Sequence, residues 1–163
     1  MPASLFSCTL STAAAFAISF VVYLLDQITK YAVRTGIGLH ETISITSFFN
    51  LVYAENLGSA FGLFKSFGVY FFIAVALIAS MTVAVLILKE PRSRLAFALV
   101  LGGALGNLTD RIANAGAVID FLDFFIGSYH WPAFNVADIG LSLGISLLLL
   151  QVLFFDRHSK ADL

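Results

Sequence analysis

The sequence NLTDRIANAGAVIDFLDFF, residues 107–125, places charged side chains directly after a long apolar run, LAFALVLGGALG at residues 95–106. A further carboxylate follows in FNVADIG, residues 134–140. Ionised groups beside apolar segments carry a large desolvation cost unless they are paired or serve a function. The apolar runs therefore decide the fold, and the polar groups at their ends are the place to look for a function.

The composition is that of a membrane protein. Of 163 residues, 60% are hydrophobic and only 12% are charged, and the mean hydropathy is +0.95. These values lie far from those of ordinary soluble domains. The net charge of -1 provides no broad basic surface, so nucleic acid is not an expected partner. Cys8 is the single cysteine, which excludes an internal disulfide and a thiolate metal cluster.

Four segments are long and apolar enough to cross a bilayer as helices, each of about 20 residues. They lie at about 13–34, 67–88, 95–113 and 134–155. The stretches at about 35–66 and 114–133 then lie outside the bilayer on the same side. Because no long linker or repeat interrupts the chain, we expect one integral membrane domain over residues 1–163. The predicted fold class is a mainly α membrane protein.

The spans alternate in direction, so the intramembrane polar groups all fall on one face. The opposite face carries the loop KEPRSR, residues 89–94, and a tail with Arg157 and Lys160. Basic residues favour cytoplasmic loops. We therefore expect both termini to be cytoplasmic and the polar groups to lie near the outer leaflet.

The two external segments differ in composition. ISITSFFNLVY, residues 43–53, is rich in β-branched and aromatic residues and predicts one or two strands of a small extracytoplasmic sheet. The segment between the third and fourth spans is expected to be a loop. Its aromatic residues Phe125, Tyr129 and Trp131 suit the lipid headgroup region.

Several polar residues have structural interpretations. Asp26 and Lys30 are four residues apart on one helix and form a mutually neutralising pair. Gly102 and Gly106 have the small-xxx-small spacing that allows helices to approach closely. Asp138 lies in the first turn of the fourth span, where a carboxylate can serve as a helix cap.

Asp120 and Asp138 suggest chemistry, because both are expected in apolar surroundings on the same side of the membrane. Two carboxylates in a water-poor pocket share one proton and so provide a general acid and a general base. Such a pair can activate water against a peptide carbonyl. Asp110 is the rival partner of Asp138, although Asn107 and Arg111 in its own turn make it look structural, and Asp123 ranks third.

Other functions fit less well. No HExxH motif and no GxSxG motif occurs, which disfavours a zinc protease and a serine hydrolase. A small transporter or channel would need polar residues through the bilayer, but residues 67–88 are almost wholly apolar. A non-catalytic scaffold, with Asp and Arg as links between helices, remains open.

Five blocks then carry a family resemblance. They are LDQITKY at 25–31, NLVYAENLGSAFGLF at 50–64, GGALGNLTDRI at 102–112, VIDFLDFF at 118–125 and HWPAFNVAD at 130–138. In this order and spacing, the chain resembles the bacterial lipoprotein signal peptidases, or type II signal peptidases. The segment between Arg111 and Asp120 is about one residue longer than the family pattern.

The resemblance implies a four-helix aspartic peptidase of the bacterial inner membrane, with a small sheet, a helical periplasmic loop and no cofactor or metal. It implies cleavage on the amino side of a diacylglyceryl-modified cysteine in prolipoproteins, and inhibition by globomycin. The apolar spans imply contact with membrane lipid, and we expect a monomer because the sequence shows no second interface signature. Asp120 and Asp138 match the catalytic pair. The matching substrate-binding positions are Asn56, Asn107, Arg111 and Asn135, and the supporting positions are Asp26, Lys30, Gly58, Gly103 and Asp110.

Overall fold

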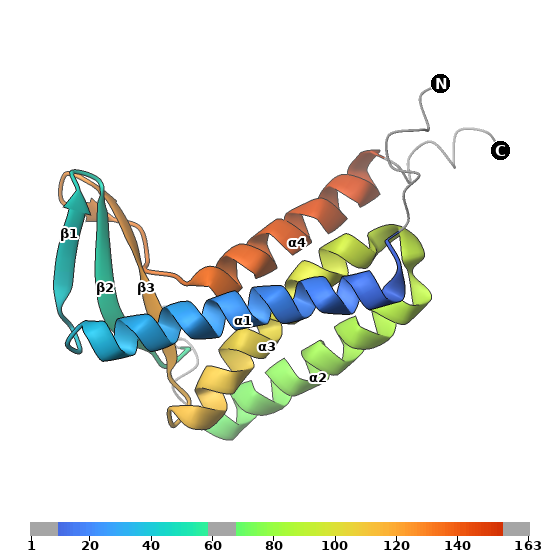
Figure 1. The fold of residues 1–163 in the computed structure, drawn as a ribbon, viewed down its shortest axis with the longest axis horizontal. Helices are drawn as coiled ribbons and strands as arrows, with labels where there is room; N and C mark the ends of the chain where they lie inside the picture. Colours follow the sequence, from blue (N-terminus) through green and yellow to red (C-terminus); the bar gives the residue numbers. More distant parts are fainter. Residues whose placement is uncertain (1–9, 59–67, 155–163) are drawn as a thin grey trace.

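The computed structural model describes residues 10–58 and 68–154. Their helices are α1 (Thr12–Gly36), α2 (Val69–Lys89), the short 3-10 helix η2 (Pro91–Ser93), α3 (Arg94–Ala113) and α4 (Val136–Phe154). Their strands are β1 (Thr42–Thr46), β2 (Phe49–Asn56), β3 (Val118–Ile126) and β4 (Tyr129–His130). The helices lie side by side, and the sheet stands at the end of the bundle where α1 finishes (Figure 1).

Four helical segments are long and apolar enough to cross a membrane, at Thr12–Gly36, Val69–Lys89, Pro91–Ala113 and Val136–Phe154. They confirm the predicted mainly α membrane fold and agree with the expected spans to within a few residues. Local signals set their limits. The Ser11 side chain accepts a hydrogen bond from the Ala14 amide and caps α1, while Pro91 opens the tight turn between α2 and α3. The tail residues Arg157 and Lys160 lie outside the described residues.

Glycines allow close contact between α3 and its neighbours. A Cβ atom at Gly102 would lie 2.6 Å from the Ser19 carbonyl oxygen of α1, and one at Gly103 would overlap the Ala137 carbonyl oxygen of α4. A Cβ at Gly106 would lie 2.5 Å from Asp26 Oδ2. The expected packing role of this glycine stretch is confirmed, since only glycine fits at such separations.

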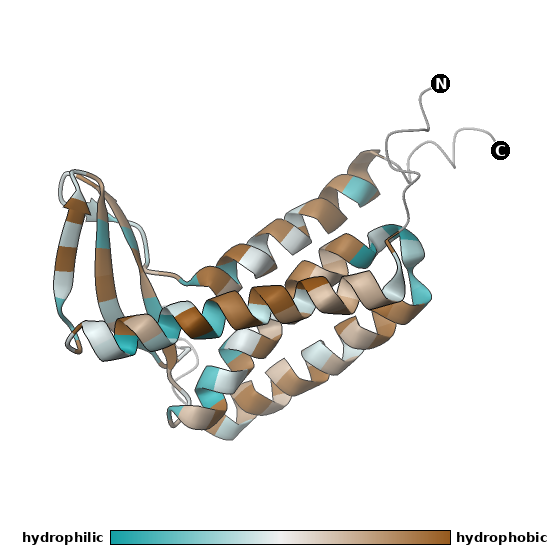
Figure 2. Cartoon of the chain, viewed as in Figure 1, coloured by the Kyte–Doolittle hydropathy of each residue, from teal (hydrophilic) through white to brown (hydrophobic). Residues whose placement is uncertain are grey.

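The polar residues gather where the bundle meets the sheet. Figure 2 shows apolar colouring along most of the four helices and polar patches towards the ends of α1 and α3 nearest the sheet. This is the end at which α3 leads into β3 and at which α4 begins. Charged groups brought together there lie beside the apolar segments, as the sequence predicts.

The sheet has the antiparallel order β1-β2-β3-β4. β2 and β3 pair along most of their length, with Ala54 opposite Asp120, and the register shifts between Leu51 and Ala54. The sequence prediction was incomplete here, because it placed strands only before the second span and a loop over 114–133. Residues 114–135 instead contain β3 and β4 and no helix, so the helical loop implied by the resemblance is not in this part of the chain.

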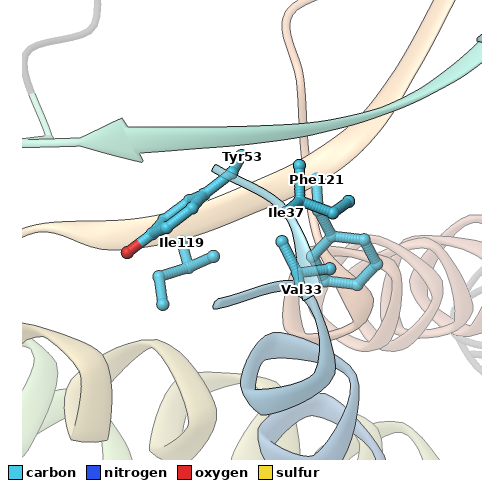
Figure 3. Close-up of a cluster of buried hydrophobic side chains, with 5 residues drawn as sticks. All are labelled: Val33, Ile37, Tyr53, Ile119 and Phe121. Atoms are coloured by element: carbon cyan, nitrogen blue, oxygen red, sulfur yellow. The ribbon is translucent and has the colours of Figure 1, made fainter. Parts of the chain in front are cut away.

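The end of α1 packs against one face of the sheet. Val33 of α1 and Ile37, directly after α1, form a buried cluster with Tyr53 of β2 and with Ile119 and Phe121 of β3 (Figure 3). Side chains alternate between the two faces of a strand. Burial of Ile119 and Phe121 against α1 therefore turns Asp120 to the opposite face of the sheet.

Candidate active site

Lys30 is the centre of a buried ion cluster that joins α1 to α3. Its Nζ lies 2.8 Å from Asp26 Oδ2 and 2.9 Å from Asp110 Oδ2, and it donates to Asn107 Oδ1 at 3.0 Å. The three hydrogens of the ammonium group thus each have an acceptor. Lys30 and both aspartates are almost completely buried. The geometry explains how these charges are tolerated beside apolar helices, because each is paired and hydrogen-bonded.

The two aspartates of this cluster also hold the elements that follow in the site. Asp26 Oδ1 accepts a hydrogen bond from the Ala137 amide at 2.8 Å, in the first turn of α4. Asp110 Oδ2 accepts from the Ile119 amide at 3.0 Å, at the start of β3. One ion cluster therefore fixes the start of α4 and the start of β3 relative to α1 and α3.

Asn135 and Asp138 form a reciprocal cap on α4. The Asp138 amide donates to Asn135 Oδ1 at 2.9 Å, and the Asn135 amide donates to Asp138 Oδ2 at 3.2 Å. This is the arrangement of a capping box. The capping interpretation of Asp138 is confirmed, and the carboxylate lies where the helix N-terminus favours a negative charge.

Asp120 lies on β3 with both carboxyl oxygens engaged. Oδ1 accepts from Asn135 Nδ2 at 2.7 Å, and Oδ2 accepts from Asn56 Nδ2 at 3.0 Å. Burial raises the pKa of Asp120 to about 6, with the negative charge of Asp138 adding to the rise and the Asn56 and Asn135 hydrogen bonds opposing it. Asn56 is held in turn, since its Oδ1 accepts from the amide of Gly58, which has a positive φ of 77°.

Asn107 completes the link between the ion cluster and the carboxyl pair. Its Oδ1 accepts from Lys30 and from Asn135 Nδ2, the latter at 3.2 Å, so its amide group is oriented with Nδ2 towards α4. That Nδ2 donates to Asp138 Oδ1 at 2.8 Å. Arg111 donates to the Asn107 carbonyl oxygen at 3.3 Å and interacts electrostatically with the three carboxylates of Asp138, Asp120 and Asp110.

Asp120 and Asp138 are thus brought together through shared amides, with Asn135 bonded to both. Every buried side-chain nitrogen and oxygen in the described residues has a hydrogen-bond partner. The same part of the chain contains no group of three or more His, Cys, Asp or Glu that could hold a metal ion. The site is a preorganised carboxyl pair surrounded by amides and two cations.

Known proteins share this fold and sequence. The family model described as signal peptidase (SPase) II matches residues 18–154. The chain belongs to the signal peptidase II family. As a member, it is a membrane peptidase and therefore a hydrolase.

Curated relatives carry the name lipoprotein signal peptidase. One from Alteromonas mediterranea is 42% identical over 152 residues, covering 89% of this chain and 82% of the relative. One from Francisella tularensis subsp. novicida is 41% identical, covering 88% and 94%. A solved structure described as a bacterial membrane enzyme, determined by the in meso method, superposes with a TM-score of 0.78 at 29% identity, over 91% of this chain and 92% of that one.

The signal peptidase II fold brings together nearly all the residues predicted from the sequence. Those in direct contact within one network are Asp26, Lys30, Asn56, Asn107, Asp110, Asp120, Asn135 and Asp138. Gly58 and Gly103 act through the backbone, at Asn56 and at the α3–α4 contact. Asp123 lies away from this network, with its carboxylate 2.9 Å from His130 Nδ1 and 2.9 Å from Asn50 Nδ2.

One residue of the network was missed. Gln27 Nε2 donates to Asp26 Oδ2 at 3.1 Å and to the Gly106 carbonyl oxygen at 3.3 Å, which links α1 to α3 beside the ion cluster. Its signal in the sequence was its position inside LDQITKY, next to Asp26 in an otherwise apolar helix. A polar amide within a span needs partners inside the bundle.

Proposed function

We propose that this signal peptidase II cleaves diacylglyceryl-modified prolipoproteins on the amino side of the lipidated cysteine, with Asp120 and Asp138 as the catalytic pair. The observation that carries the proposal is the single residue that bonds both carboxyl groups, Asn135. Its side-chain Nδ2 donates to Asp120 Oδ1, and its backbone amide donates to Asp138 Oδ2. The names of the relatives support the substrate class.

The surroundings of the two carboxyl groups support different roles. Asp138 is the ionised base, because the N-terminus of α4 and the Asn107 amide stabilise its charge. Asp120, whose pKa burial raises to about 6, holds the shared proton. A substrate over the site excludes water and favours the protonated form further.

Hydrolysis then follows in two steps, each with two proton transfers. Water attacks the peptide carbonyl carbon while Asp138 takes a proton from that water and Asp120 gives its proton to the carbonyl oxygen. Asp138 then gives a proton to the amide nitrogen as the carbon–nitrogen bond breaks, and a hydroxyl proton of the intermediate returns to Asp120. The products are a carboxylic acid on the signal peptide and a free amine on the cysteine.

The remaining polar residues are proposed to bind substrate or support the pair. Asn56, Asn107, Arg111 and Asn135 line the carboxyl pair and contact the scissile segment or a globomycin-type inhibitor. Asp26, Lys30, Gly58, Gly103 and Asp110 hold the supporting elements. No cofactor takes part in this scheme. We also propose that the chain is a monomer of the bacterial inner membrane, with cytoplasmic termini and its site near the outer leaflet.

The test is cleavage of a diacylglyceryl-modified prolipoprotein by the wild type and by the Asp120→Asn, Asp138→Asn and Asp110→Asn variants, with folded yield recorded for each. We expect folded but inactive protein for Asp120→Asn and Asp138→Asn. Asp110→Asn should lose folded yield, because it weakens the contacts to Lys30 and Ile119. Good yield of an inactive Asp110→Asn variant, together with an active Asp120→Asn variant, would overturn the choice of pair.

A further inference from the structure

The far end of the sheet carries an apolar edge that no contact within the described residues covers. We define the β3–β4 edge as Ile126, Tyr129 and Trp131, whose exposed fractions are 86%, 86% and 70%. No Asp, Glu, Lys or Arg occurs between residues 124 and 137, so this edge has no charged residue of its own. The neighbouring carboxylate of Asp123 is held by Asn50 and His130. Three large exposed apolar or aromatic side chains in this setting mark an interaction surface.

The position of this edge follows from the transmembrane helices. α4 has 19 residues, or about 28 Å of helix, which matches the ~30 Å hydrocarbon core of a bilayer. Its first residue, Val136, therefore lies at the hydrocarbon boundary. Trp131 precedes it by five residues, so its Cα lies at most about 18 Å away. The edge is thus within reach of the headgroup region, next to the lipid-facing surface of α4.

The order of the strands agrees with this position. β3 is the strand that connects to the spans on both sides, since it follows α3 and since Leu122 bridges to Phe134 just before α4. β1 lies at the other edge of the sheet. Figure 1 shows β3 on the side of the sheet towards α3 and α4, and β1 on the side away from them. The apolar edge is therefore on the membrane side of the sheet.

Contacts on one side of β4 hold this edge in place. His130 Nδ1 lies 2.9 Å from Asp123 Oδ1, its ring stacks on Phe125, and the Trp131 amide donates to the Phe124 carbonyl oxygen at 2.8 Å. Because neighbouring residues of a strand alternate in direction, fixing His130 towards Asp123 turns Tyr129 and Trp131 the other way. Their exposure is thus a consequence of how the sheet is built.

We infer that the β3–β4 edge is a membrane-docking surface that inserts into the headgroup region of the outer leaflet, independently of substrate. Tyrosine and tryptophan favour this region because each has an apolar body and a polar group. Docking fixes the depth of β3, which carries Asp120 six residues before Ile126, or about 20 Å along the strand. The bilayer itself then helps to position the carboxyl group.

Trp131 is the only tryptophan of the chain, so its fluorescence reports this edge directly. The full-length protein is reconstituted without substrate into phosphatidylcholine vesicles that carry bromine either near the headgroup or near the end of the acyl chain. We expect blue-shifted emission that shallow bromine quenches more strongly than deep bromine. A Trp131→Phe variant establishes the background.

Ile126→Asp places a charge on the β3–β4 edge. Ile45→Asp on β1 is the matched control, because Ile45 is also exposed but lies on the opposite edge of the sheet. We expect Ile126→Asp to lose most of the quenching and Ile45→Asp to retain it, with both variants folded by circular dichroism. Emission that brominated lipid does not quench would overturn the proposal. So would quenching or a spectral shift that arises only after a prolipoprotein is added, which would assign the edge to substrate.

Discussion

Replacing Asp120 by Asn should change the pH dependence of stability in a definite direction. In the folded chain the pKa of Asp120 is raised from 3.8 to about 6, chiefly by burial. The folded state therefore binds more protons than the unfolded state between these values, and the wild type loses stability as the pH rises through this window. A difference of roughly two pKa units between the folded and unfolded states corresponds to about 3 kcal/mol of folding free energy.

Asn at position 120 also has a cost that does not depend on pH. Both Asp120 oxygens accept from amide groups, Asn135 Nδ2 and Asn56 Nδ2. A side-chain amide must turn its own donor towards one of them, which costs about 1–3 kcal/mol for the unsatisfied group. The absolute stability of the variant is thus a balance of similar terms. The hydrogen-bond cost is the same at every pH. The change with pH of the stability difference between variant and wild type therefore reports the charge of Asp120 alone.

The measurement is reversible unfolding of both proteins in mixed micelles from about pH 3.5, where Asp120 is protonated in the folded state, to about pH 7.5, where it is ionised in both states. We expect the variant to gain about 3 kcal/mol relative to wild type over this range. Asp123→Asn is the control with the opposite sign. Burial alone would raise the pKa of Asp123, but hydrogen bonds from Asn50 and His130 outweigh it and keep the pKa below its usual value. A stability difference for Asp120→Asn that is flat with pH, or slopes as the control does, would refute the reasoning.

Three further outcomes follow from the same contacts. Asn56→Ala removes a hydrogen bond that lowers the pKa of Asp120, so the alkaline limb of kcat/KM against pH should move upwards; a downward shift would contradict the model. Lys30→Met leaves two buried carboxylates without their cation and should lower folding stability by about 3–5 kcal/mol, which appears as loss of folded yield. Recovery of stable protein would show that the ion cluster is dispensable. Gly103→Ala forces α3 from α4 and should cost about 1–3 kcal/mol or more, measured by thermal unfolding. The control Gly36→Ala also has nothing within 4 Å of the new Cβ and should not lower the transition temperature.

The sequence predicted the membrane helices well because their signal is local. A run of about 20 apolar residues is sufficient evidence of a span, whatever the rest of the chain does. The limits of the four helices accordingly fall close to those expected from composition. The sequence also predicted that the polar groups lie at one face of the bundle. Consecutive spans alternate in direction, so the polar ends of the four spans must lie on the same side.

The third strand was missed because its pattern is not that of a half-exposed strand. In VIDFLDFFI, residues 118–126, both faces of the strand are buried at its start, one against α1 and the other at the carboxyl pair. Regular alternation of apolar and polar residues is then lost. The hydrogen bonds from asparagine to the carboxyl pair could not be predicted from local sequence either. That Asn135 bonds both Asp120 and Asp138 depends on the distance between β3 and α4, which no local spacing encodes.

The ion cluster and the carboxyl pair form two layers with opposite electrostatic requirements. In the inner layer, Lys30 has three acceptors, so its charge and those of Asp26 and Asp110 are satisfied inside the protein. In the outer layer, the hydrogen bonds to Asp120 and Asp138 come from neutral amides, while Lys30 and Arg111 act on the pair through their electrostatic field. A cation in direct contact would hold both carboxyl groups ionised and so remove the acid of the proposed mechanism. Amides can orient the pair without fixing its charge, and this explains why asparagine rather than lysine or arginine lies between the two layers.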